Sequence, residues 1–167
     1  HIQVVRSLEL RGISDDVLQE TALDLMKFEW ARSGRPVFDV VRIPSFIESV
    51  LFANELDGEI AECVVYQGSS AKIIRHFASL DKTLYLFDTF TGLTTDDRKI
   101  EAEMGIGVEP KKQFAETSLE LAKNTIFSGI KGKNIDFEED SVVFYSGPIK
   151  ETLQNVKDIN FSLVHLD

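Results

Sequence analysis

The sequence contains little cysteine, with Cys63 as the one thiol among 167 residues. An internal disulfide needs two cysteines and a zinc cage built from cysteine needs several, so neither is possible within this chain. Because disulfides are typical of oxidising compartments, this scarcity fits a reducing environment. We therefore expect a cytoplasmic protein.

Long apolar runs and an excess of basic residues are also lacking. No run approaches the roughly 20 apolar residues that a membrane helix needs, and the first residues do not follow the charged-then-apolar plan of a signal peptide. With 18 basic against 28 acidic residues, the formal net charge is -10. Such a charge disfavours nucleic acid and anionic membrane surfaces, whose binding depends on cationic side chains. We expect neither as a partner.

The sequence does contain enough apolar material for one globular core, since 43% of its residues are hydrophobic and 10% are aromatic. A helical pattern begins at Ser14, which can cap a helix, and ends before Gly34. Pro44 then opens a second helix as a first-turn proline. We predict an N-terminal helical cap region over residues 1–43 and a core domain over residues 44–167.

The stretch from Ile60 to Ser70 organises the rest of the chain. An apolar run closes there on Gly68, Ser69 and Ser70, which is the pattern of a buried parallel strand, predicted over 59–66, that leads into a helix. We expect Ser69 or Ser70 to cap this helix. Its first turn offers unpaired N–H groups and a partial positive charge, so anionic ligand groups are favoured there.

Glu62 places a carboxylate inside this otherwise apolar strand. A buried charge without a partner is costly, so the side chain needs a partner, and a ligand cation is one candidate. A glutamate that faces water at a sheet edge is the alternative.

A second acidic residue ends the next predicted strand, which runs from Thr83 to Phe87. Asp88 follows Glu62 by 26 positions, and in nucleotide-binding βαβ units an acid near this distance hydrogen-bonds the two ribose hydroxyls. A carboxylate suits that role because it only accepts hydrogen bonds. A helix or turn cap is the alternative for Asp88.

The remaining chain continues the alternation of strands and helices. We predict a long surface loop with a short helix over 94–113, helices from Thr117 or Ser118 and from Pro148, and strands over 142–145 and 159–166. Such an alternation predicts an α/β fold, with a mostly parallel sheet, right-handed crossovers and helices on both faces. Four strands are few for this fold, so we expect further strands beyond Asp167.

Several motifs of this chain occur together, in the same order, in a known family. They are Gly58 to Cys63 leading to Gly68–Ser70, Leu86 to Leu93, Phe114 to Glu120, and Gly147 with Thr152–Leu153. In these motifs the chain resembles class I S-adenosylmethionine-dependent methyltransferases, and most of all the macrocin O-methyltransferase (TylF/MycF) family. The family ordinarily has Gly where Val64 and Ser69 stand. The resemblance, which covers about residues 44–167, implies a Rossmann-like class I methyltransferase core that is truncated here after its fourth strand.

The resemblance also implies where the cofactor S-adenosylmethionine binds. Its methionine part would be held by Glu62, by the backbone around Val64 to Tyr66, and by Gly68, Ser69 and Ser70. Asp88 would bind the ribose, and the adenine would be flanked by Thr89, Phe90, Gly147, Pro148 and Ile149. The cofactor carries a sulfonium, an ammonium and a carboxylate, so an acid and a helix N-terminus suit its charges.

The candidates for the chemical step lie at the end of the last predicted strand. The resemblance implies that Asp167 is the first of the family's acidic magnesium ligands, which makes it both the metal and the catalytic candidate. Because Mg²⁺ usually takes more than one carboxylate, Asp167 alone does not complete such a site. His165 shares a strand face with Asp167 and is a candidate general base, and a hydrogen-bonded core histidine is the alternative.

We therefore predict an S-adenosylmethionine-dependent O-methyltransferase that acts on a hydroxyl of a small molecule, such as a sugar or natural product. Two alternatives stay open. One is a catalytically degenerate methyltransferase fold that binds the cofactor weakly or binds only a protein partner. The other is a nicotinamide-dependent oxidoreductase, which is disfavoured because residues 62–70 contain one Gly where a pyrophosphate loop needs three. Both monomer and homo-oligomer are compatible with the sequence.

Overall fold

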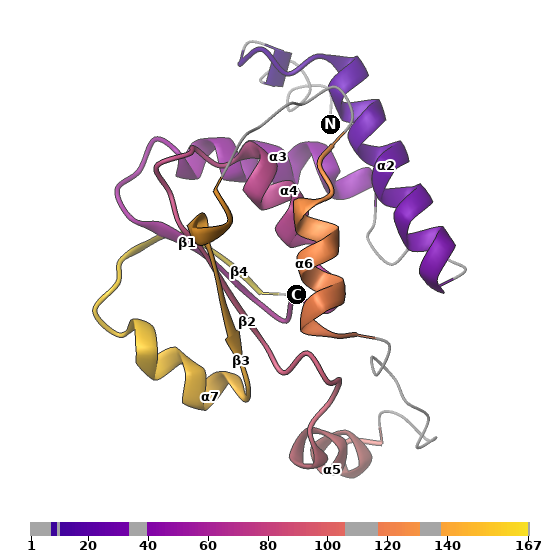
Figure 1. Cartoon of the computed structure of the whole chain (residues 1–167), viewed down its shortest axis with the longest axis vertical. Coiled ribbons are helices and arrows are strands. Elements are labelled where there is room, and N and C mark those ends of the chain that lie inside the picture. Colours follow the sequence, from indigo (N-terminus) through magenta and orange to yellow (C-terminus); the bar gives the residue numbers. More distant parts are fainter. Residues whose placement is uncertain (1–7, 10, 34–39, 106–116, 131–137, 167) are drawn as a thin grey trace.

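The computed structural model describes the chain except for residues 1–7, 10, 34–39, 106–116, 131–137 and 167. Its elements alternate between helices and strands along the chain (Figure 1). In chain order they are α2 (Asp15–Ser33), the 3₁₀ turn η1 (Val40–Arg42), α3 (Ile43–Ala53), β1 (Glu59–Cys63), α4 (Ser69–Phe77), β2 (Leu84–Asp88), α5 (Thr95–Glu103), α6 (Leu119–Phe127), η2 (Glu139–Ser141), β3 (Val142–Ser146), α7 (Ile149–Thr152), η3 (Leu153–Val156) and β4 (Phe161–Leu166).

The strands of the described residues form one parallel sheet in the order β3-β2-β1-β4. The chain thus builds outward from β1 to β2 and β3, and then returns to the other side of β1 for β4. The order of strands reverses between β1 and β4, and open α/β sheets bind their ligands beside such a switch point, at the carboxyl ends of the strands. The predicted α/β fold class is confirmed.

Helices cover both faces of the sheet, as predicted (Figure 1). On one face Ile60, Leu84 and Leu86 are fully buried in a core shared with α3, α4 and α6. On the other face Phe87 packs in a smaller cluster with Val156 of η3. Because alternate residues of a strand point to opposite faces, Glu62 and Asp88 share the face of Ile60, Leu84 and Leu86.

The local sequence explains where several helices begin. Pro44 stands in the first turn of α3, whose buried stripe includes Ile47 and Val50. Ser118 caps α6, and its side chain accepts a hydrogen bond from the amide of Leu121 at 3.0 Å. The first-turn proline predicted for α3 and the cap predicted for α6 are therefore confirmed.

Three expected boundaries are wrong. The cap of α4 is Gly68, with φ 87°, and Ser69 and Ser70 lie inside the first turn, so neither serine caps the helix. β1 ends at Cys63 rather than Tyr66, because Val64 and Tyr66 have positive φ angles that a strand does not allow. The helix expected from Pro148 is an α-helix only over Ile149–Thr152 and continues as the 3₁₀ turn η3.

The short helix expected within the predicted 94–113 loop is present as α5, over Thr95–Glu103. Most of the rest of the predicted 94–113 loop lies outside the described residues. Among the helices that the structure describes, none combines the length and the apolar character needed to cross a bilayer.

Candidate functional site

Glu62 lies in β1, one residue before the strand ends, and its side chain has no exposed area. Atom Nδ1 of His165, on the neighbouring strand β4, lies 2.9 Å from its Oε1. The alternative of a water-facing glutamate is therefore wrong. The next residue, Cys63, is also buried, and burial together with the charge of Glu62 raises the pKa of its thiol. Cys63 therefore remains a neutral thiol beside a buried carboxylate.

The loop after β1 has an unusual backbone. Val64 and Tyr66 have φ angles of 69° and 51°, in the left-handed region where residues with a side chain are strained. The amide of Val64 donates to the carbonyl of Phe87 at 2.9 Å, which ties the loop to β2. Val64 is 45% exposed, so its isopropyl group projects from the end of the sheet.

Gly68 is required by both conformation and space. Its φ is 87°, and a Cβ added there would lie 3.1 Å from the carbonyl oxygen of Ala122 and 3.2 Å from Ile126 Cγ1 of α6. The absence of a side chain lets α4 begin directly against α6. The N–H groups of the first turn of α4, at Ser69 and Ser70, thus start at the carboxyl end of β1, where they suit an anionic ligand group.

Asp88 joins the loops that follow β1 and β2. Its side chain is buried, and its two oxygens accept hydrogen bonds from the amides of Tyr66, at 2.9 Å, and Phe90, at 2.6 Å. The turn-cap role considered for this residue is therefore observed. A carboxylate has about four acceptor positions, so the two backbone bonds leave acceptor capacity for ribose hydroxyls.

Thr117 is a site residue that sequence reasoning missed. Its hydroxyl donates to the carbonyl of Tyr66 at 2.5 Å, while Asp88 accepts from the amide of the same residue. Tyr66 is thus held on both sides in its left-handed conformation. The sequence at Thr117 indicates a possible helix cap, and nothing local to it indicates a contact 51 positions away.

The residues expected to flank an adenine lie together after β2 and β3. The amide of Gly147 donates to the carbonyl of Asp88 at 3.0 Å, and the hydroxyl of Ser146 donates to the carbonyl of Thr89 at 3.3 Å. Phe90 has a positive φ of 53° and is buried. Pro148 and Ile149 follow at the start of α7. The structure thus brings the β1, β2 and β3 tips into one continuous edge.

Of the two metal and catalytic candidates, the structure describes only His165. Asp167 lies outside the described residues. His165 lies in β4, where it contacts Glu62 and its ring centroid lies 4.7 Å from that of Phe46. Among the side chains that the structure describes, no group of three His, Cys, Asp or Glu residues is arranged to hold a metal ion.

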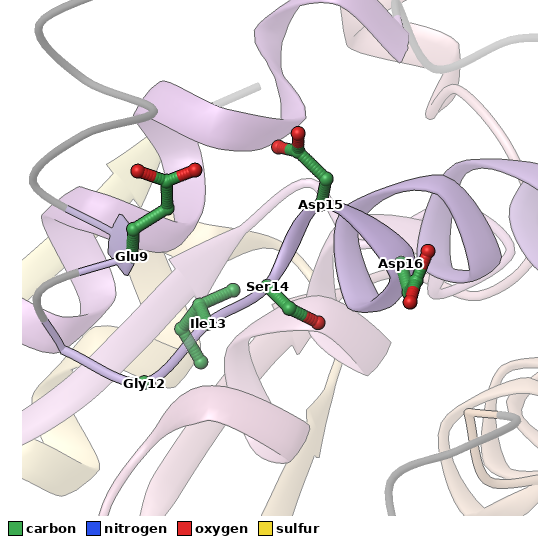
Figure 2. Close-up of a pocket in the computed structure, with 6 residues that line it drawn as sticks. All are labelled: Glu9, Gly12, Ile13, Ser14, Asp15 and Asp16. Atoms are coloured by element: carbon green, nitrogen blue, oxygen red, sulfur yellow. The ribbon is translucent and has the colours of Figure 1, made fainter.

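A surface pocket of about 370 Å³ lies in the N-terminal segment and contains none of the predicted site residues. Glu9 and Asp16 lie on opposite sides of the labelled lining residues, with Ile13 and Ser14 between them (Figure 2). This pocket is therefore separate in sequence from the strand-tip site.

Comparisons with known proteins show the family and the fold of this chain. The sequence profile of the family described as Macrocin-O-methyltransferase (TylF) matches residues 12–167. The fold is similar to that in the crystal structure of CalS11, a calicheamicin methyltransferase, with a TM-score of 0.52 and 18% sequence identity over 89% of this chain. The match spans 66% of the length of that protein. No sequence among the curated proteins matches the chain.

Proposed function

The chain belongs to the TylF macrocin-O-methyltransferase family, and from this premise we propose that it binds S-adenosylmethionine and transfers its methyl group to a hydroxyl of a small molecule. A sugar or another natural product is the acceptor class that fits the family. The bound cofactor supplies an electrophilic methyl group on a sulfonium. Transfer would form an O–C bond and break the C–S bond, so that S-adenosylhomocysteine leaves with the electron pair and the hydroxyl proton passes to solvent.

The single observation that carries this proposal is the placement of two carboxylates on one face of the sheet at adjacent strand ends. Glu62 lies near the tip of β1 and Asp88 ends β2, and the loop between β1 and α4 is hydrogen-bonded to Asp88. S-Adenosylmethionine has a cationic amino-acid end and a ribose with two hydroxyls, which match these two acids in chemistry and in order.

The residues of this edge have distinct proposed roles. The first-turn amides of α4, at Ser69 and Ser70, bind the carboxylate of the methionine part. The charge of Glu62 favours the cationic groups. Asp88 accepts from the ribose hydroxyls with the acceptor capacity that its backbone bonds leave. Asp167 remains the proposed first ligand of a magnesium ion, which would orient the acceptor and lower the pKa of its hydroxyl.

A second candidate function is a methyltransferase fold that binds the cofactor weakly and does not catalyse. The observation that favours it is Val64, which occupies a left-handed position at the point where the family ordinarily has Gly. Its exposed side chain stands where the loop would approach the cofactor.

Calorimetric titration separates these functions. We expect the chain to bind S-adenosylmethionine and S-adenosylhomocysteine but not NAD⁺. Gly68→Ala should abolish this binding, because the added Cβ meets α6, whereas the matched control Gly129→Ala should bind normally. Gly129 has a similar φ of 75°, but nothing lies within 4 Å of its Cβ position. Heat with NAD⁺ alone would support an oxidoreductase, and heat with none of the three ligands would contradict the cofactor assignment.

A further inference from the structure

Glu62 and His165 form a pair across two parallel strands. The residues are directly opposite in the register of β1 and β4, and His165 Nδ1 lies 2.9 Å from Glu62 Oε1. An ionised carboxylate only accepts hydrogen bonds, so this contact with an ionised Glu62 requires the hydrogen on Nδ1. In that state the bond runs from the imidazole to the carboxylate.

The surroundings of this pair favour a fixed geometry. Glu62 has no exposed area, and the side chain of His165 is 14% exposed. The ring of Phe46, on α3, lies 4.7 Å from the imidazole at an interplanar angle of 54°. Aromatic contact at this distance restricts how the imidazole can turn. Glu62 is thus held by β4, and β4 in turn is braced by α3.

Burial alone would favour the protonated, neutral form of Glu62, because a charge is poorly solvated in the protein interior. A hydrogen bond donated to the carboxylate favours its charged form instead. A neutral imidazole that donates through Nδ1 leaves the pair with one net negative charge, located beneath the loop that begins at Val64.

We propose that His165 is a positioning residue that keeps Glu62 ionised and oriented, so that the edge of the sheet selects for the positive charge of its ligand. This role rests on the proposed function, because it concerns binding at the same edge. It differs from that of a general base, since His165 acts here through Glu62 and not on the acceptor. Because Glu62 is fully buried, its charge acts on the ligand through the low-dielectric interior.

A series of ligands with falling positive charge tests this role. S-Adenosylmethionine carries a sulfonium and an ammonium, S-adenosylhomocysteine carries only the ammonium, and 5′-methylthioadenosine carries neither. We expect His165→Leu to weaken binding of S-adenosylmethionine about tenfold, to weaken S-adenosylhomocysteine less, and to leave 5′-methylthioadenosine unchanged. His165→Asn, whose amide places a donor near the Nδ1 position, should stay within about threefold of the wild type for all three ligands.

Two further variants make the result decisive. Glu62→Gln keeps the shape of the side chain and removes its charge, so it should reproduce the graded loss even where His165→Leu folds poorly. Ser162→Ala is the matched control, because its hydroxyl donates to the carbonyls of Gly58 and Glu59 at the other end of β4. We expect it to bind all three ligands normally.

The outcomes that overturn the inference are distinct from those that overturn the proposed function. An equal loss for the three ligands, or tighter binding of S-adenosylmethionine by His165→Leu, contradicts the role of His165 while the cofactor assignment stands. A His165→Asn variant as weak as His165→Leu does the same. A wild-type chain that binds none of the three ligands contradicts the cofactor assignment as well.

Discussion

Val64 combines a left-handed backbone conformation with a β-branched side chain. A left-handed conformation costs an L-residue about 1–2 kcal/mol, and a β-branched side chain is especially unsuited to it. Its amide is fixed by the carbonyl of Phe87 at 2.9 Å, which holds the residue in this conformation. Strain of this kind persists where the surrounding structure determines the backbone, and it is often found at ligand sites. The loop from Val64 to Gly68 thus keeps its shape despite the side chain at Val64.

Val64→Gly is therefore expected to stabilise the protein. Relief of the strain, offset by the greater chain entropy of glycine when unfolded, should raise the free energy of unfolding by about 0.5–1 kcal/mol. Removal of the exposed isopropyl group should also tighten S-adenosylmethionine binding several-fold. Urea unfolding and calorimetry measure the two effects.

The matched control for this change is Val164→Gly. Val164 is 51% exposed and lies within β4, so glycine there should lower stability by about 0.5–1 kcal/mol. If Val64→Gly destabilised the protein as much as Val164→Gly, the strain would not be the dominant effect at Val64.

At the residue scale the sequence predicted the two acids but not their contacts. Glu62 was identifiable because a charge inside an apolar strand is unusual, and Asp88 because it ends the next strand. The hydrogen bonds that the amides of Tyr66 and Phe90 donate to Asp88 depend on positive φ angles that a non-glycine sequence does not indicate. The contact of Thr117 with Tyr66 arises only when α6 packs beside α4.

At the element scale, α4 is buried on more sides than its apolar pattern predicted. The apolar side chains of Ile73, Ile74 and Phe77 are buried, but so are Lys72, Arg75 and His76. The guanidinium of Arg75 binds locally, because it donates to the carbonyls of Lys82 at 2.6 Å and Ser79 at 2.7 Å. Burial of the stem with a satisfied polar tip explains why a charged residue can lie in a core.

Lys72 connects three helices. Its ammonium lies 2.6 Å from Asp24 Oδ2 on α2 and 2.9 Å from the hydroxyl of Ser128, which follows α6. The side chain of Lys72 is 2% exposed, whereas that of Asp24 is 33% exposed. The N-terminal helix α2 is thus linked by an ion pair to α4, which begins after the β1 loop.

Asp24→Ala is expected to lower the free energy of unfolding by about 1–3 kcal/mol. The change removes the carboxylate that pairs with a buried ammonium, and the exposure of Asp24 keeps the effect below the range for a fully buried pair. Lys72→Met in the same background should recover part of the loss, because it removes the charge and keeps the apolar stem. Thermal or urea unfolding measures both.

The exposed ion pair between Arg11 and Glu55 provides the control. Its nitrogen–oxygen distance is also 2.6 Å, but the two side chains are 33% and 56% exposed. Glu55→Ala should therefore change stability by less than about 1 kcal/mol. Equal effects at Asp24 and Glu55 would mean that burial of Lys72 adds nothing to the strength of its pair.

At the scale of the whole molecule, the alternation of strands and helices was sufficient to predict the parallel sheet and its two covered faces. The strand order β3-β2-β1-β4 was not contained in the pattern, although the placement of Glu62 and Asp88 at one edge follows from parallel strands alone. The division into residues 1–43 and 44–167, the magnesium site and the oligomeric state stay predictions. Asp167, on which the metal site depends, lies outside the described residues.

The account depends on one ligand lying across the tips of β1 and β2, and a crystal structure of the chain with S-adenosylhomocysteine tests this most directly. We predict that the amino-acid end lies over the loop from Val64 to Gly68, next to the first turn of α4, and that the ribose hydroxyls contact Asp88. A ligand bound in the reverse direction, or at another surface while this edge stays empty, would contradict the account.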